Sequence, residues 1–357
     1  MNVIKRKVEL IMLKNIKLSD LCDDCFKDNT IIETKIYPID YLLKGGLELG
    51  YIFQFVGDSA VGKSTIALQI AKSVCEQGYN LLYLDSEGSI TQEMLKTTGV
   101  MEHYNDQFYL QKCSKFDEVE KVLDRFISTG EISFIFIDSL AALINPGFVN
   151  LNHDKTKFGR TGISVTTNEA HVTSGPLTKF MTKYRSLATS QNICFVLINQ
   201  YRTSIDGHYN TSTKLYGPKN VQYASDVIIK ISDCASIGPF KSFKDFTKET
   251  SPSVGKPLEF EVYRSNKLSP GIKVPGYLKY GSGIDNIYSY FYELKENNII
   301  TQAGVYYSLP FRGNEIKEKG AISFIEKLRC ENFNASDFKE LISSNNSNSD
   351  SDSDMEV

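Results

Sequence analysis

Nine consecutive residues in the first fifth of the chain have the spacing of a phosphate-binding loop. The stretch GDSAVGKST runs from Gly57 to Thr65 and satisfies the pattern GxxxxGK[ST]. In such a loop the glycines let backbone N–H groups curl round phosphate oxygens, Lys63 reaches the terminal phosphates, and the Ser64 hydroxyl ligates Mg²⁺. The predicted nucleotide-binding residues are Gly57, Asp58, Ser59, Ala60, Val61, Gly62, Lys63, Ser64 and Thr65.

Carboxylates at the ends of two further apolar runs could act on a nucleotide held in this loop. The run FIFID ends on Asp138, which we expect to hold Mg²⁺ beside Ser64, partly through the water shell of the ion. The run LLYLDSEG ends on Asp85 and Glu87, and either could polarise a water for in-line attack on the γ-phosphate. If the strand continues through both, they lie on the same side about 6.6 Å apart, so only one can be ideally placed.

These side chains need strands that end at one edge of a sheet. Strand-length apolar runs alternate with helical patterns along the chain: YIFQFV, LLYL, FIFI, ICFVLI, and later DVIIKI and EFEVY. Helices are predicted from about Gly62 to Glu76, near Gln92, from Phe116 to Phe126, and around Leu177 to Leu187. The alternation predicts an α/β fold with a mostly parallel sheet covered on both faces, and ligands at the carboxyl ends of its strands.

Composition narrows the class of protein. The chain of 357 residues is 41% hydrophobic, and no apolar run approaches the ~18 residues of a membrane helix, so we expect a cytoplasmic protein without a membrane partner. Cysteines are scattered, and the pair Cys22 and Cys25 lacks the two further ligands of a zinc site, which favours reduced thiols. The tail SSNNSNSDSDSDMEV carries four acids and no base, and its composition predicts disorder. It either solubilises the chain or competes with DNA for basic surface.

The order of the motifs resembles that of a known family. The blocks GDSAVGKST, YLDSEGSITQEMLKTTGV, FIFIDSLAAL, FVLINQYRTS and LKYGSGIDNIYSYFYELKENNIITQAGVYYSLP look like the RecA family of homologous-recombination ATPases. Within it they look most like the UvsX-type recombinases of tailed phages. The similarity extends from about Thr34 to about Leu309, and implies a RecA-like P-loop ATPase core that uses ATP and Mg²⁺.

The resemblance also implies roles for single residues. Glu87 matches the water-activating glutamate of the family, which favours it over Asp85. Gln200, at the end of FVLINQ, matches the residue that senses the γ-phosphate and relays nucleotide state to a DNA-binding loop. Arg264 and Lys267, in YRSNKLSPG, are candidates for the two cations that reach the ATP of a neighbouring subunit. Their spacing departs from that of the family, where the pair is two residues apart, which leaves open that Lys267 or Arg264 alone does the work.

Two polar, glycine-containing segments are similar in position to the DNA-binding loops of the family. The first spans about Phe148 to Val172 and the second about Tyr201 to Asn220. Cations in them could neutralise phosphates, and tyrosines such as Tyr209 and Tyr216 could stack on unpaired bases. The candidate DNA-binding residues are Lys155, Lys157, Arg160, Arg202, Tyr209, Lys214 and Lys219.

The resemblance implies four regions and one principal function. Residues 1–33 would be an arm that docks on the adjacent protomer, 34–290 the ATPase and DNA-binding core, 291–342 a C-terminal region, and 343–357 a disordered acidic tail. The chain would form helical filaments on single-stranded DNA and exchange strands with a homologous duplex, with a mediator or single-strand-binding protein as a further partner. If phage-encoded, it would work in the bacterial host cytoplasm. A ring-forming helicase and a recombination mediator without turnover are the alternatives.

Overall fold

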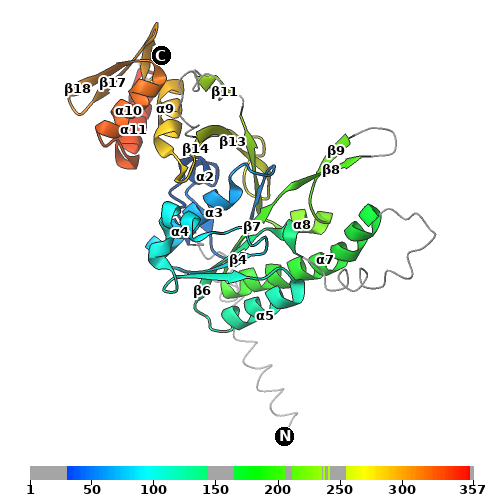
Figure 1. Cartoon of the computed structure of the whole chain (residues 1–357). Coiled ribbons are helices and arrows are strands. Elements are labelled where there is room, and N and C mark those ends of the chain that lie inside the picture. Colours follow the sequence, from blue (N-terminus) through cyan, green and yellow to red (C-terminus); the bar gives the residue numbers. More distant parts are fainter. Residues whose placement is uncertain are drawn as a thin grey trace, which may run out of the picture. The chain divides into compact units, whose positions relative to one another are not determined.

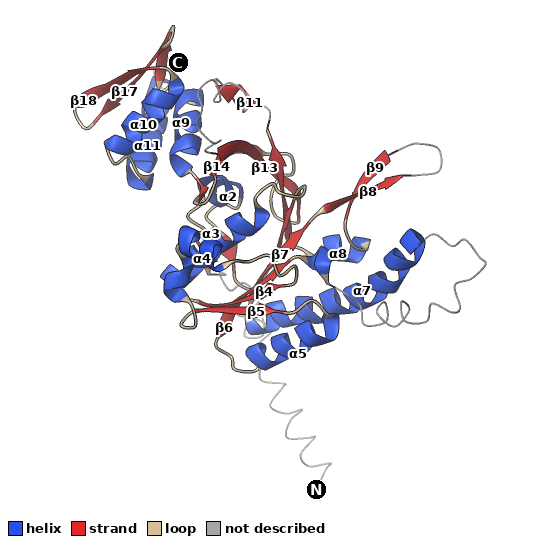
Figure 2. Ribbon diagram, viewed as in Figure 1, coloured by secondary structure: helices blue, strands red, loops and turns tan. Residues whose placement is uncertain are grey.

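A single large sheet organises most of the described chain. The computed structural model describes residues 30–143, 165–205, 211–234, 236–237, 240–241 and 255–353. Within that part of the chain, nine strands form one sheet in the order β15-β14-β13-β10-β3-β7-β6-β4-β5 (Figures 1 and 2). Their bounds are β3 Ile52–Val56, β4 Asn80–Asp85, β5 Phe108–Lys112, β6 Ile132–Asp138, β7 Cys194–Asn199, β10 Val227–Asp233, β13 Gly255–Ser265, β14 Lys273–Lys279 and β15 Gly283–Ile284.

The strands from β10 to β5 pair in parallel, and β13, β14 and β15 add an antiparallel edge. The predicted mostly parallel α/β sheet is thus confirmed. Every residue of β3 and β7 is buried, which explains their continuous apolar runs, because a strand covered on both faces needs no polar alternation. The carboxyl ends of these strands lie at one edge of the sheet, and the candidate site forms there.

Helices cover both faces of the sheet (Figure 1). On one face, α3 (Lys63–Glu76) and α4 (Gln92–Thr98) pack against the sheet in the largest hydrophobic cluster, to which α2 (Tyr37–Leu42) also contributes. On the other face lie α5 (Phe116–Ile127) and α7 (Val165–Gln191). The sequence pattern predicts a buried face of α5 that ends at Phe126. The buried residues are Phe116, Val119, Leu123 and Ile127, and Phe126 is only partly buried.

Short elements connect the layers. The 3₁₀ turns are η2 (Val100–His103) and η3 (Leu140–Ala142), and α8 (Lys219–Ala224) precedes β10. Two-stranded antiparallel pairs form between β1 (Ile31–Ile32) and β2 (Leu47–Glu48), and between β11 (Ser236–Ile237) and β12 (Phe240–Lys241).

The second predicted DNA-binding loop contains regular structure. Strands β8 (Tyr201–Ile205) and β9 (Thr211–Leu215) pair as an antiparallel hairpin that extends away from the main sheet (Figure 2). Pairing lets a polar segment satisfy its own backbone groups, so it need not remain an irregular loop. The first predicted loop also differs from expectation, because residues 165–172 belong to α7, which continues from its packed half into the polar stretch.

The C-terminal residues build a separate hydrophobic cluster. It joins α9 (Asn286–Glu296), the three-stranded sheet β16 (Thr301–Ala303), β17 (Tyr306–Phe311) and β18 (Asn314–Lys319), α10 (Ala321–Cys330) and the start of α11 (Ala335–Ser353). Helix α9 runs across the boundary expected at residue 290. The backbone is helical through Ser353, whereas the sequence predicts disorder from residue 343, because α11 continues from a half anchored by Phe338. Residues 354–357 lie outside the described part.

Candidate nucleotide-binding site

The predicted phosphate-binding loop joins the end of β3 to the start of α3. Two residues in it have left-handed backbone conformations, Ala60 with φ 60° and Gly62 with φ 101°. A Cβ on Gly62 would lie 2.5 Å from Cδ2 of Leu278, and one on Gly57 would lie 2.3 Å from the carbonyl oxygen of Ile231. Glycine is therefore required at both positions, because the loop packs closely against β10 and β14.

The loop opens onto the amino end of α3, where unpaired backbone N–H groups favour an anion. Lys63, the first residue of α3, folds back over the loop: its Nζ donates to the carbonyl oxygens of Gly57 at 2.9 Å and Asp58 at 2.6 Å. Burial lowers the pKa of Lys63, whereas the nearby carboxylates of Asp138 and Glu87 raise it. The ammonium group thus lies among the loop carbonyls with two acids close by.

Asp138 ends β6 beside the loop and is 2% exposed. The hydroxyl of Tyr83 donates to its Oδ2 at 2.8 Å, and the side chain of Ser64 also hydrogen-bonds to the carboxyl group. Burial raises the pKa of Asp138, and these two hydrogen bonds oppose the shift. A hydroxyl and a carboxylate placed together beside a phosphate-binding loop are oxygen ligands that suit Mg²⁺. The residues therefore fit the ion that the sequence predicts.

Glu87 and Asp85 have different environments. Strand β4 ends at Asp85, so the alternation that would put both acids on one side does not extend to Glu87. Asp85 is 1% exposed and accepts hydrogen bonds from the backbone N–H groups of Ser89 at 3.1 Å and Ile90 at 3.0 Å. It therefore holds the turn that follows β4. Glu87 is exposed and lines the cavity at the loop, where Ser139 Oγ donates to its Oε1.

A cavity of about 310 Å³ brings most of the predicted nucleotide residues together. The loop, Glu87, Asp138 and Gln200 all border it. Gln200 follows β7, and its carbonyl oxygen accepts a hydrogen bond from the backbone N–H of Tyr216 at 3.0 Å. Asn199, the last residue of β7, also contacts Tyr216, because its Nδ2 donates to the Tyr216 carbonyl oxygen at 3.0 Å. The cavity wall and the end of β9 are thus linked.

The sequence motifs do not predict all the residues that border the cavity. Ser139, Leu278 and Tyr280 line it, and Tyr280 lies 47% exposed in the turn between β14 and β15. Tyr83, which supports Asp138, is fully buried within β4. The stretch KYGSG around Tyr280 carries a turn signal, but only the fold places that turn beside a loop more than 200 residues earlier.

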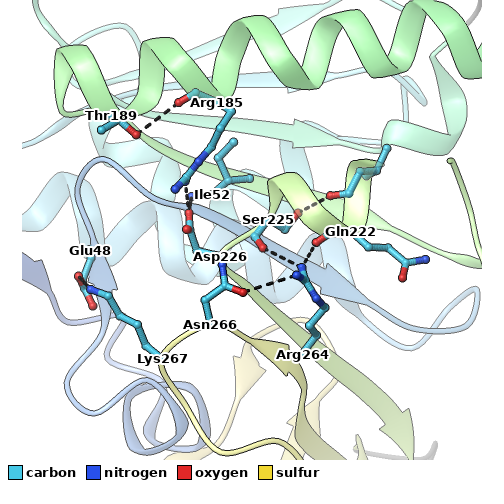
Figure 3. Close-up of polar contacts among 11 residues, drawn as sticks. Glu48, Ile52, Arg185, Thr189, Gln222, Ser225, Asp226, Arg264, Asn266 and Lys267 are labelled. Carbon is cyan, nitrogen blue, oxygen red and sulfur yellow. Dashed lines mark hydrogen bonds and ion pairs between the residues drawn. The ribbon is translucent and has the colours of Figure 1, made fainter. Parts of the chain in front are cut away.

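Arg264 and Lys267 do not border this cavity. Figure 3 shows them in a polar cluster near the amino end of β3. Arg264 donates to the carbonyl oxygen of Gln222 and to that of Ser225, the latter at 3.3 Å, at the end of α8. Lys267 Nζ lies 3.0 Å from Glu48 Oε2. Lys267 borders a second cavity of about 280 Å³ together with Asp226, whose carboxylate accepts from Arg185 and from the N–H of Ile52. Neither cation therefore reaches the nucleotide cavity of its own chain.

The candidate DNA-binding residues are only partly described. Lys214 and Lys219 are exposed, at the end of β9 and the start of α8. Arg202 pairs with Lys214 through the backbone of the hairpin. Lys155, Lys157, Arg160 and Tyr209 lie outside the described residues, as do residues 1–29 of the expected docking arm with Cys22 and Cys25.

The sequence is similar to those of several known proteins. Residues 17–285 match the family model described as the RecA N-terminal domain. The protein RecA of Lactobacillus delbrueckii subsp. bulgaricus is 24% identical over 273 residues, which cover 76% of this chain and 74% of that protein. The RecA of Fusobacterium nucleatum is 24% identical over 279 residues, 77% of this chain and 66% of that protein. The mitochondrial DNA repair protein recA homolog 3 of Arabidopsis thaliana is 24% identical over 293 residues, 81% of this chain and 62% of that protein. Among the helices of the described residues, none has the length and apolar character to cross a membrane.

Proposed function

This chain belongs to the RecA family, and from that premise we propose that it is an ATP- and Mg²⁺-dependent DNA strand-exchange recombinase. It forms helical filaments on single-stranded DNA, pairs that strand with a homologous duplex, and hydrolyses ATP to release the DNA. The observation that carries the proposal is the shared cavity: one space is bordered by the phosphate-binding loop, two acids and Gln200. Binding, water activation and readout of a nucleotide can thus occur at one place.

Each group in the cavity has a task in phosphoryl transfer. Backbone N–H groups of the loop and Lys63 bind the phosphates. Ser64 and Asp138 would hold Mg²⁺, which would neutralise phosphate charge. Glu87 accepts a proton from the attacking water, and the Ser139 hydroxyl that donates to it fixes its direction. Tyr83 supports Asp138 from within the sheet. Asp85 has no part in the reaction and holds the turn that presents Glu87.

Gln200 connects the nucleotide to DNA binding. Its side chain borders the cavity, and its backbone is hydrogen-bonded to Tyr216 at the end of the β8–β9 hairpin. A change in the contacts of Gln200 with the γ-phosphate therefore biases the position of the hairpin, which carries Arg202 and Lys214 toward DNA. Lys219 follows on α8, and Lys155, Lys157, Arg160 and Tyr209 complete the proposed DNA surface.

The chain is further proposed to be a UvsX-type recombinase of a tailed phage, on the strength of the five motif blocks. It then acts in the bacterial host cytoplasm in recombination, repair and recombination-dependent replication, with a mediator or single-strand-binding protein that loads it. Arg264 and Lys267 act in trans, on the nucleotide of the next protomer in the filament. Their distance from the cavity of their own chain supports this assignment.

Electron microscopy on long circular single-stranded DNA tests the proposal. With a slowly hydrolysed ATP analogue and Mg²⁺, we expect continuous striated coats, and without nucleotide we expect none. With ATP, phosphate release should rise strongly when single-stranded DNA is added. Discrete rings would favour a helicase, and coats with no phosphate release would favour a mediator.

Matched substitutions of Glu87 and Asp85 test whether Glu87 is the general base for ATP hydrolysis. Glu87→Gln should keep the coats but lower DNA-dependent phosphate release by about 10²-fold or more, because the general base is lost. Asp85→Asn should leave phosphate release within about threefold and instead lower thermal stability, because the turn loses a charged acceptor. Equal loss of turnover in the two variants would overturn the assignment.

A further inference from the structure

A second lysine reaches the phosphate-binding loop from a distant strand. Lys256 lies at the start of β13, and its Nζ donates to the carbonyl oxygen of Ala60 at 2.9 Å. The same ammonium forms an ion pair with Asp233 Oδ1 at 2.7 Å, at the end of β10. The side chain of Lys256 is only 15% exposed, although lysine usually extends into solvent. Two strands of the sheet thus hold the loop through one side chain.

The contact of Lys256 with Ala60 affects the backbone conformation of the loop. Ala60 has φ 60°, a left-handed conformation that costs a non-glycine residue energy unless its surroundings fix it. The loop can bind phosphate only when its N–H groups point inward, and its carbonyl groups must then point outward. Lys256 holds the Ala60 carbonyl, and so opposes rotation of the peptide unit that carries the N–H of Val61.

The two lysines near the loop differ in what each can do on nucleotide binding. Lys63 donates to Gly57 and Asp58 within the loop and is the residue proposed to move onto the phosphates. Lys256 is held by Asp233 from outside the loop and does not border the cavity. Its contact with Ala60 can therefore persist while Lys63 changes partners.

We propose that Lys256, anchored by Asp233, is a positioning residue that fixes the phosphate-binding loop in its anion-accepting conformation for nucleotides that carry a β-phosphate. The proposal rests on the proposed function, because it concerns the same loop. Lys256 acts through Ala60 and touches no reacting atom. Its removal weakens nucleotide binding because part of the binding energy must then reorder the loop.

Equilibrium binding of fluorescent ATP and ADP analogues to the full chain tests this role. Lys256→Met keeps the aliphatic stem and should weaken both nucleotides roughly tenfold, as for the loss of one charge-assisted hydrogen bond. In steady-state phosphate release the same variant should raise KM by a similar factor and change kcat less than twofold. Lys256→Arg should restore most of the affinity. Lys273→Met is the matched control, since Lys273 on β14 pairs with Glu259 at 2.7 Å and contacts no loop residue among those described.

Asp233→Asn distinguishes two roles of the charges near the loop: holding Lys256 in position, and acting electrostatically on the bound nucleotide. This substitution removes a negative charge near an anionic ligand, so attraction alone would tighten nucleotide binding. If Asp233 instead anchors Lys256, binding should weaken two- to threefold, and adding Asp233→Asn to Lys256→Met should produce no further loss.

Three results would overturn the inference while leaving the proposed function intact. These are wild-type affinity in Lys256→Met, an equal loss in Lys273→Met, or tighter binding in Asp233→Asn. A wild-type chain that binds neither nucleotide would overturn both the inference and the proposed function. Thermal unfolding of each variant excludes global destabilisation as the cause of a loss.

Discussion

At the scale of single residues, Asp40 gives the fold a measurable dependence on pH. Its carboxylate accepts hydrogen bonds from Thr34 N at 2.8 Å and Thr34 Oγ1 at 2.7 Å. Burial raises the pKa of Asp40 from 3.8 to about 6, and the bonds from Thr34 only partly oppose that shift. Because the folded-state pKa lies above that of an unfolded aspartate, this group adds stability below pH 4 and loses that contribution as the pH rises through about 6.

Asp40→Asn should remove this dependence. The amide oxygen can still accept from Thr34 but carries no charge to desolvate, so the variant should gain thermal stability relative to wild type as the pH rises from about 4 to about 6. Melting temperatures measured at half-unit pH steps give the difference directly. Glu93→Gln, an exposed acid in the first turn of α4, is the control and should track wild type. A constant difference between Asp40→Asn and wild type across this range would contradict the prediction.

Residue types at fixed spacing were enough to predict the centre of the site, but not its support. The loop and Asp138 follow from local motifs, because each lies at the end of a strand that the pattern identifies. The role of Gln200 follows only from the resemblance to the RecA family. The choice of Glu87 over Asp85 rests on the resemblance to the RecA family, because strand alternation alone leaves both acids as candidates. The structure adds that β4 ends at Asp85. Tyr83 and Tyr280 could not be predicted, since each reaches the site through packing between distant parts of the chain.

At the scale of elements, α11 packs against α9 through a buried aromatic side chain, Phe338, with Leu341 and Ile342 partly buried beside the same cluster. Phe338 stacks on Tyr290 with ring centroids 4.5 Å apart, and meets Tyr37 of α2 edge-on at 4.9 Å. It is 6% exposed and is followed by a stretch of α11 rich in serine and asparagine. The polar half of the helix has no apolar face of its own, so its helicity depends on this anchored half.

Phe338→Ala should release α11 without unfolding the ATPase region. We expect a loss of about 3–5 kcal/mol in the local free energy of opening, as for other buried phenylalanines. Hydrogen–deuterium exchange should accelerate in α11 and α9 and stay unchanged in α3. Tyr41→Ala, a half-exposed tyrosine on α2, is the control and should leave α11 protected. Faster exchange throughout the chain would mean that the C-terminal cluster and the sheet open together.

Sequence patterns predict elements well where the core decides their structure. The strands β3, β4, β6 and β7 and the helices α3 and α5 follow from apolar periodicity, because one or both of their faces are buried. The β8–β9 hairpin, the first part of α7 and the end of α11 are polar, so no burial pattern marks them. Their structure depends on pairing or on continuation from a packed segment, which periodicity cannot detect.

At the scale of the whole molecule, the two ends of the parallel strands carry different parts of one proposed reaction. The carboxyl edge holds the loop, Glu87 and Asp138, and the cluster with Arg264 and Lys267 lies near the amino end of β3 (Figure 3). In a head-to-tail filament, the cluster with Arg264 and Lys267 on one protomer can meet the carboxyl edge of the sheet on the next protomer. Both cations have partners within their own chain, so joining the neighbour requires them to exchange Glu48 and the α8 carbonyls for phosphate.

Filaments that contain two variants should show whether Arg264 and Lys267 act on the nucleotide of the next protomer. Glu87→Gln protomers lack the base but keep both cations, and Arg264→Ala/Lys267→Met protomers keep the base but lack the cations. Each alone should release little phosphate. An equal mixture should recover about one quarter of the wild-type rate, because half of the protomers carry Glu87 and half of their neighbours supply the cations. A mixture of Glu87→Gln with Lys63→Met is the control and should recover nothing, since both groups serve the cavity of their own chain. A rate equal to the mean of the two separate variants would instead mean that Arg264 and Lys267 act on the nucleotide of their own protomer.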